Sequence, residues 1–213
     1  MTVPQPIRYV ALGDSTGVGV GSRVGGGYVE RIFRRLQAGA PEATLLNLCV
    51  SRASSANVVR SQLPRVRPAQ PTLVTVGIGI NDITHGVPVE DYVRNVDTIL
   101  RALTADTAAR VVLCNLPDVS HAPRVPAFLK ENIRERLRGH NARLATLAAQ
   151  HDVTLADVFT PSLQLMPGRD GLFGEDGFHP SDAGYALWAE QLWPFVARAV
   201  GWDRAQTLAT SSV

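Results

Sequence analysis

The chain has 213 residues, of which 45% are hydrophobic, and a formal net charge of +2. This length and composition suit one domain with a sizeable core, which we expect to span residues 1–202, while the tail at 203–213 has little to bury and should be flexible. The small net charge, with basic residues spread along the chain, argues against a nucleic-acid surface. No apolar run approaches the roughly 20 residues of a membrane span, so we expect no integral membrane segment.

Two further features bear on the cellular compartment. The first ten residues contain Pro4 and Pro6 and lack the continuous apolar stretch of a secretion signal, which favours a cytoplasmic location. Cys49 and Cys114 lie in apolar runs without metal-ligand spacing. We therefore expect both cysteines to behave as small buried hydrophobic residues in a reducing compartment.

Strand-like apolar runs alternate along the chain with segments of helical periodicity. Such alternation predicts an α/β fold in which a parallel sheet lies between two layers of helices. The expected strands are residues 9–12, 44–50, 72–77, 110–115 and 153–158, and the expected helices are residues 28–38, 55–63, 89–103, 128–151 and 181–199.

Three segments rich in Gly, Pro and polar residues, at 16–27, 117–127 and 160–175, are expected to be loops. Each of them follows a predicted strand. Since ligands of parallel sheets bind at the carboxyl ends of the strands, these loops should border the functional site.

Two short motifs near opposite ends of the chain carry residues suited to catalysis: Gly-Asp-Ser at 13–15 and Asp-Gly-Phe-His at 176–179. A serine hydroxyl becomes a good nucleophile only when a base takes its proton, and that base needs a third group to orient it. An acid three residues before a histidine can reach one ring nitrogen within a single turn. Ser15, His179 and Asp176 therefore form a candidate triad, although either motif alone would more often be an ordinary turn or helix cap.

A third motif, Gly-Ile-Asn-Asp at 79–82, also follows an apolar run. The side-chain amide of Asn81 is a donor suited to the negative charge that develops on a carbonyl oxygen under attack. Three motifs at three strand ends thus fit together chemically.

These motifs resemble the sequence blocks of the SGNH, or GDSL-type, hydrolase family, over about residues 9–198. In that family the first block supplies the nucleophilic serine, and the last block supplies the acid and the histidine. The serine N–H, a block-two glycine N–H and the block-three asparagine side chain form the oxyanion hole. The resemblance implies that Ser15, Asp176 and His179 are catalytic, that Asn81 stabilises the oxyanion, and that no cofactor or metal is required.

The resemblance also implies a three-layer α/β/α sandwich with five parallel strands in the flavodoxin-like order 2-1-3-4-5. In that order the strands that carry Cys49 and Cys114 are separated by two others, which places the cysteines roughly 14 Å apart. A disulfide requires Cα atoms within about 7 Å, so both thiols should be free.

One block departs from the family pattern, because Arg52 stands where block two usually has glycine. A backbone N–H does not depend on the side chain, so we expect the Arg52 N–H to complete the oxyanion hole, although non-glycine residues resist positive φ. The guanidinium could crowd the site, attract an anionic substrate group or point into water, and the sequence leaves these alternatives open.

Other polar residues lie beside the motifs. Asp14 and Asp82 are expected to hold loops by accepting backbone N–H bonds rather than to serve as the triad acid. Gly79 is a candidate for motif support, and His85 is a candidate for lining the pocket. The remaining histidines show no metal-ligand spacing, so we expect no metal site.

Two rival interpretations start from the same glycines. The Gly-x-Ser-x-Gly pattern at 13–17 fits the nucleophile elbow of α/β-hydrolases, but that elbow follows several strands, whereas this motif ends the first one. The glycines at 17–27 suggest a non-catalytic nucleotide-binding module of flavodoxin-like fold. This alternative is remote, because no G-x-G-x-x-G window occurs and the second strand ends without an acid for a ribose.

The sequence therefore predicts a serine esterase that hydrolyses small-molecule carboxylic esters through an acyl-enzyme, with short acyl chains as the default. A thioesterase, a lysophospholipase or an acyltransferase of the same family is the alternative. The motifs do not distinguish these activities, because pocket loops determine selectivity. The sequence does not indicate the oligomeric state.

Overall fold

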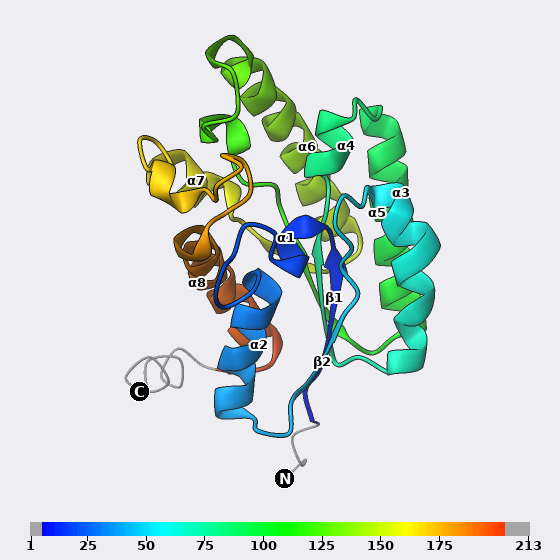
Figure 1. Ribbon diagram of the computed structural model, residues 1–213. Coiled ribbons are helices and arrows are strands. Elements are labelled where there is room, and N and C mark those ends of the chain that lie inside the picture. The colour runs from blue at the N-terminus through cyan, green and yellow to red at the C-terminus, as the bar shows by residue number, and fades with distance from the viewer. Residues whose placement is uncertain (1–5, 203–213) are drawn as a thin grey trace.

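The structure is a computed structural model that describes residues 6–202, so the expectation for the tail at 203–213 falls outside the described residues. Its centre is a five-stranded parallel sheet in the order β2-β1-β3-β4-β5, which confirms the predicted order (Figure 1). The strands are β1 (Arg8–Gly13), β2 (Thr44–Asn47), β3 (Leu73–Gly77), β4 (Arg110–Cys114) and β5 (Thr154–Ala156).

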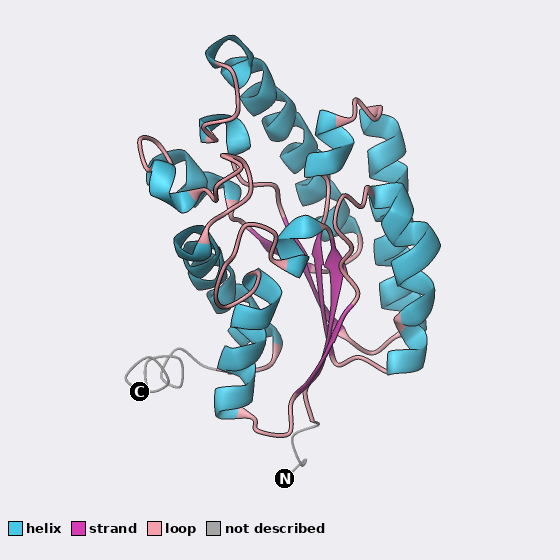
Figure 2. Ribbon diagram, in the orientation of Figure 1, coloured by secondary structure: helices cyan, strands magenta, loops and turns pink. Residues whose placement is uncertain are grey.

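Helices cover both faces of this sheet (Figure 2). The longer ones pack with α2 and α8 on one face and with α5 and α6 on the other. Short helices α1, α3, α4 and α7 follow the ends of strands. The bounds are α1 (Ser15–Val18), α2 (Tyr28–Gly39), α3 (Ser55–Asn57), α4 (Ile80–Thr84), α5 (Val89–Asp106), α6 (Lys130–Gln150), α7 (Phe159–Leu165) and α8 (Asp182–Ala199).

Alternation along the central strand produces the two apolar layers. Tyr9 and Ala11 of β1 belong to the core shared with α2 and α8, whereas Val10 and Leu12 belong to the core shared with α5 and α6. Successive strand side chains point to opposite faces, so a strand covered on both sides must be apolar at every position. The continuous apolar run of β1 is therefore the signal of a central strand, and its carboxyl end opens onto the motif that carries Ser15.

Several segments differ from the sequence-based expectations, among them the expected loop at 16–27, whose start forms α1. β2 ends at Asn47 rather than at residue 50, although the Leu48 and Val50 N–H groups still bond the carbonyls of Ala11 and Gly13. The expected helix at 55–63 is helical but irregular, since α3 continues into a π-helical turn (Val58–Gln62) and then a 3-10 turn that contains Pro64. The expectation of a loop at 160–175 was wrong for the first residues of that segment, which belong to α7.

Two expectations about composition can be compared with the described residues. Cys49 and Cys114 are both free, as the strand order requires. Within residues 6–202, none of the helices is both long enough and apolar enough to span a bilayer.

Candidate active site

Ser15 lies at the first position of α1, directly after the carboxyl end of β1. Asp14 caps this short helix, because its carboxylate accepts hydrogen bonds from the Thr16 N–H at 3.0 Å and from the Thr16 hydroxyl at 2.8 Å. The strand and the cap together fix the turn that presents the serine. Ser15 is only 6% exposed.

His179 and Asp176 lie in one tight turn just before α8. The His179 Nδ1 and one Asp176 carboxylate oxygen are 2.5 Å apart. The other Asp176 oxygen accepts the N–H groups of Phe178 and His179, each at 2.9 Å. Gly177, with φ of 67°, allows the chain to reverse between them. Both oxygens of the Asp176 carboxylate are therefore occupied by hydrogen bonds from the same turn, and these bonds hold the imidazole in one orientation.

The two motifs meet across the site. The His179 Nε2 lies 3.0 Å from the Ser15 Oγ, although the residues are far apart in the sequence. Because Nδ1–H donates to Asp176, the neutral ring has Nε2 free to accept the serine proton. The three side chains thus form one hydrogen-bonded chain from carboxylate to hydroxyl.

The ionisation of Asp176 suits this arrangement. Burial alone would raise the pKa of Asp176, but the hydrogen bonds from the His179 ring and from the Phe178 and His179 N–H groups outweigh burial and hold the pKa below its usual range. The carboxylate therefore stays charged at neutral pH, where it stabilises a protonated imidazole.

Three donors of the expected oxyanion hole can be located. Asn81 lies in the first turn of α4 and lines the cavity beside Ser15. One of its Nδ2 hydrogens is donated to the Ala53 carbonyl at 2.8 Å, which leaves the other available. Among residues 6–202, the backbone N–H groups of Ser15 and Arg52 have no hydrogen-bond acceptor.

Arg52 adopts φ of 66°, the left-handed conformation that favours glycine. The backbone at this position thus has the conformation that a glycine would adopt easily, despite the larger side chain. The side chain is exposed, and Arg52 is not among the residues that line the cavity.

The neighbouring motif residues play supporting roles. Asp82 is buried, and its carboxylate accepts the Ser55 N–H and the Ser55 hydroxyl, so it ties α4 to α3 as expected. Burial raises the pKa of both Asp14 and Asp82. Gly79 has φ of 139°, and a Cβ there would lie 2.8 Å from the Tyr92 hydroxyl, so both conformation and space require glycine.

His85 is exposed at the C-terminal end of α4 and does not line the cavity. Among residues 6–202, no group of three or more His, Cys, Asp and Glu side chains is arranged to hold a metal ion.

A cavity of about 80 Å³ opens beside Ser15 and His179. Asp14, Ser15, Asn81 and His179 form its polar side. The rest of the lining comes from α7 and its flanking residues, the segment 172–180 and α8, and it is largely apolar. Its side chains include Val158, Leu165, Met166, Leu172, Phe178 and Leu187. An apolar cavity with a few convergent polar groups at one end is typical of a small-molecule site.

Family comparison agrees with this geometry. Residues 11–187 match the family described as GDSL-like Lipase/Acylhydrolase. The chain belongs to this family. As a GDSL-like acylhydrolase it is a serine ester hydrolase.

Similar proteins include Esterase TesA of Pseudomonas aeruginosa, which is 24% identical over 186 residues that make up 87% of this chain and 85% of TesA. The solved lipase Lip_vut3 from a goat rumen metagenome has a TM-score of 0.72 and 23% identity, covering 93% of this chain and 99% of its own. Axe2, an acetylxylan esterase from Geobacillus stearothermophilus, has a TM-score of 0.74 and 18% identity, covering 95% and 98%. At these identities the two solved structures show that the GDSL-like fold is shared.

Sequence reasoning missed several contributors to the site of this GDSL-like acylhydrolase. The apolar wall from α7 was expected to be loop, although Pro161 near the start of an apolar stretch is a helix-start signal. Trp188 lines the same cavity from α8 and stacks on Tyr28, with ring centroids 5.3 Å apart. Gln62 contacts the backbone beside Ser15, and no local pattern indicates that contact.

Proposed function

We propose that this GDSL-like hydrolase cleaves carboxylic esters through an acyl-enzyme formed on Ser15. The observation that carries the proposal is the continuous chain from Asp176 through His179 to the Ser15 hydroxyl at the mouth of the cavity. His179 Nε2 takes the Ser15 proton while Oγ attacks the ester carbonyl, and it then gives that proton to the departing alkoxide. Water then loses a proton to His179 as its oxygen attacks the acyl carbon. The bond between that carbon and the Ser15 Oγ breaks, His179 returns the proton to Oγ, and the carboxylic acid leaves.

Asp176 orients His179 and stabilises the imidazolium without taking its proton. The Ser15 N–H, the Arg52 N–H and the Asn81 amide are the proposed oxyanion donors. Each such donor is typically worth about 3 kcal/mol of transition-state stabilisation, because it is already aimed at the developing charge. The free N–H groups of Ser15 and Arg52 support this assignment.

The cavity supports esters of short acyl chains. Its apolar wall would bind an aliphatic acyl group, and its volume of about 80 Å³ is small for a ligand site. The alcohol would leave toward solvent on the side of His179, which donates its proton.

Labelling with a serine-directed phosphonate tests the nucleophile. We expect one adduct, which peptide mass spectrometry places on Ser15. Ser162 is a matched control within the same protein, because it lines the cavity but donates its hydroxyl to the Phe159 carbonyl at 2.6 Å instead of to a histidine. An adduct on Ser162 or any other residue would refute the assignment.

A series of p-nitrophenyl acetate, butyrate, octanoate and palmitate, together with acyl-CoA thioesters, tests the substrate class. We expect kcat/KM to be largest for the shorter oxygen esters. Leu165→Ala, which removes part of the apolar wall, should move the optimum toward longer chains. A preference of the unmodified enzyme for palmitate or for thioesters would contradict the proposal.

A further inference from the structure

The hydrogen-bond ladder on one side of β1 loses one bond just before the proposed nucleophile. β1 and β2 pair in register from Arg8 and Thr44 to Ala11 and Asn47, and the Leu48 N–H still bonds the Ala11 carbonyl at 2.9 Å. In a continued parallel ladder, the Gly13 N–H would next bond the Leu48 carbonyl. The Val50 N–H still bonds the Gly13 carbonyl at 3.2 Å, but the Gly13 N–H does not bond the Leu48 carbonyl, so this buried donor two residues before Ser15 needs another partner.

The side chain of Gln62 supplies that partner. Its Oε1 accepts the Gly13 N–H at 2.9 Å, and its Nε2 donates to the Gly13 carbonyl at 2.8 Å. The carboxamide therefore supplies the acceptor that the Gly13 N–H lacks and adds a second donor to the Gly13 carbonyl, which also accepts the Val50 N–H. Gln62 is only 1% exposed, so water does not compete for these bonds.

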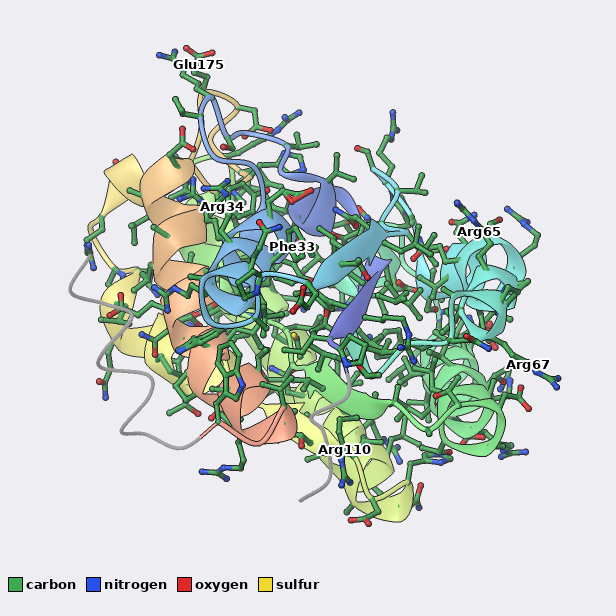
Figure 3. The ribbon with its side chains drawn as sticks, turned by 90° about the horizontal axis from the view of Figure 1, so that it is seen from below. Phe33, Arg34, Arg65, Arg67, Arg110 and Glu175 are labelled. Carbon is green, nitrogen blue, oxygen red and sulfur yellow. The ribbon has the colours of Figure 1, made fainter. Side chains whose placement is uncertain are left out.

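The local backbone aims this side chain at β1. Gln62 ends the π-helical turn Val58–Gln62, a rare geometry that recurs at functional sites. Arg65 and Arg67 follow closely in the chain and are exposed, projecting away from the sheet (Figure 3). Among these three long polar side chains, only Gln62 is directed into the core.

The backbone around Gly13 has little room to move in other directions. A Cβ at Gly13 would lie 2.6 Å from the Gly77 carbonyl oxygen and 3.2 Å from the Cys49 sulfur. Gln62 closes the remaining side of this enclosure. After it, only Asp14 separates Gly13 from Ser15, whose Oγ must stay at 3.0 Å from His179 Nε2.

We propose that Gln62 is a positioning residue for the nucleophile, replacing the missing rung of the β2 ladder and thereby holding Ser15 in line with His179. The inference rests on the proposed role of Ser15. Gln62 contacts neither the cavity nor the triad, so it acts only through the Gly13 backbone. Displacement of a reacting group by about 1 Å can cost on the order of 100-fold in rate, which sets the scale of the expected effect.

The chain contains a matched control for this contact. Asn141 of α6 is also buried, and its amide bonds both the Leu116 N–H and the Leu116 carbonyl, each at 2.9 Å. Leu116 follows β4 and carries no proposed catalytic group. The two carboxamides thus make the same pair of contacts with the backbone, one two residues before the proposed nucleophile and one beside Pro117, which lines the cavity without a catalytic group.

The experiment compares Gln62→Met with Asn141→Leu, each of which removes both hydrogen bonds. Both variants should lower the melting temperature, because each leaves a buried backbone N–H unpaired, although the Gly13 carbonyl keeps the Val50 N–H. Gln62→Met should lower kcat and the rate of phosphonate labelling by roughly 10- to 100-fold at nearly unchanged KM. Asn141→Leu should change kcat by no more than a few-fold. A folded Gln62→Met protein with near-normal kcat, or equal losses of kcat in both variants, would overturn the proposal.

Gln62→Glu provides a second readout that depends on pH. A protonated carboxyl can replace both amide contacts, whereas an ionised one places an oxygen without a hydrogen against the Gly13 carbonyl. Burial favours the protonated form. The kcat of Gln62→Glu relative to the unmodified enzyme should therefore be highest at low pH and fall as pH rises.

If the ratio of the kcat of Gln62→Glu to that of the unmodified enzyme did not change with pH, this would count against the proposal even if Gln62→Met failed to fold. The outcome for the catalytic assignment is separate: labelling away from Ser15 refutes the proposed nucleophile, whereas labelling at Ser15 with kcat insensitive to Gln62 refutes only the positioning role.

Discussion

The two halves of the proposed active site are held in place by different means. Ser15 is buried at the end of a central strand, and its surroundings come from β3, the segment after β2 and the π-helical turn that carries Gln62. The Asp176–His179 turn is more exposed, with 36% of the Asp176 side chain and 23% of the His179 side chain accessible. Its defining hydrogen bonds join residues no more than three positions apart.

This difference indicates which substitutions should displace each half of the site. The position of the nucleophile depends on contacts between distant segments, so changes in the core can displace it. The acid–base pair is preassembled by its own turn, so damage there should come from changes within the turn or from loss of its docking on the rest of the protein. Substitutions in each half can therefore test this distinction.

The largest effect is expected from Ser15→Ala. Loss of the nucleophile in well-studied triads removes roughly 10⁶ in kcat, because no other group can form the acyl-enzyme. The serine contributes one partly solvated hydrogen bond to stability, so the melting temperature should hardly change. Ester hydrolysis and thermal denaturation measured on the same preparation would check both. Retention of even a tenth of kcat would assign the chemistry to another residue.

A smaller loss is expected from Asp176→Asn, on the order of 10⁴ in kcat, as for other triads that lose the orienting acid. His179→Ala should be the more damaging change, since it removes the base itself. Because the hydrogen bonds from His179 and the turn hold the pKa of Asp176 below its usual range, its carboxylate should remain ionised in the unmodified enzyme at acidic pH where a free aspartate begins to protonate. Equal losses in the two variants would mean that Asp176 does more than orient the ring.

Docking of the acid–base turn can be tested through Asp182, at the start of α8. Its carboxylate accepts the Ser22 hydroxyl at 2.5 Å and the Arg23 N–H at 2.9 Å, and it pairs with Arg31 at 2.7 Å. These contacts hold the loop that contains Gly21, where a Cβ would lie 3.0 Å from the His179 Cβ. The hydrogen bond from Ser22, followed by those from the loop N–H groups and the charge of Arg31, lowers the pKa of Asp182.

Asp182→Asn should therefore lower the melting temperature and reduce kcat a few-fold. A lowered carboxyl pKa stabilises the fold above the unfolded value of about 3.9, and this contribution disappears as pH falls through the lower folded value. The difference in melting temperature between the unmodified enzyme and Asp182→Asn should thus be largest near neutral pH and should disappear at acidic pH. Glu175→Gln is the control, because Glu175 lies at the periphery (Figure 3) and pairs with Arg23 in solvent. A loss as large for Glu175→Gln would contradict specific docking by Asp182.

The same division explains what could be predicted from the sequence. The contact between Asp176 and His179 could be predicted because both residues lie in one turn. The strand order followed from the apolar runs together with the family resemblance. Gln62 could not be identified, because its partner is the backbone of a glycine 49 positions away. The apolar wall was missed for a related reason: α7 is short, and its side chains acquire their role only where β5, α8 and the loop at 172–180 meet.

The smallest expected effect concerns Arg52, whose conformation was the main uncertainty in the oxyanion hole. Its φ of 66° costs a non-glycine residue about 1–2 kcal/mol. Glycine would relieve that cost but would lose about 0.5–1 kcal/mol through its greater freedom in the unfolded chain. Arg52→Gly should therefore raise the free energy of unfolding by about 0.5 kcal/mol, measurable by urea denaturation.

Kinetics of the same variant separate the two possible roles of Arg52. If only its N–H matters, kcat for neutral esters should stay unchanged, and Gln70→Gly, at a second positive φ of 47°, should give a similar gain in stability with no kinetic effect. If the exposed guanidinium also attracts substrate, KM should rise for esters that carry a carboxylate and remain constant for neutral ones. A fall in kcat for neutral esters would show that the arginine side chain, and not its backbone alone, shapes the oxyanion hole.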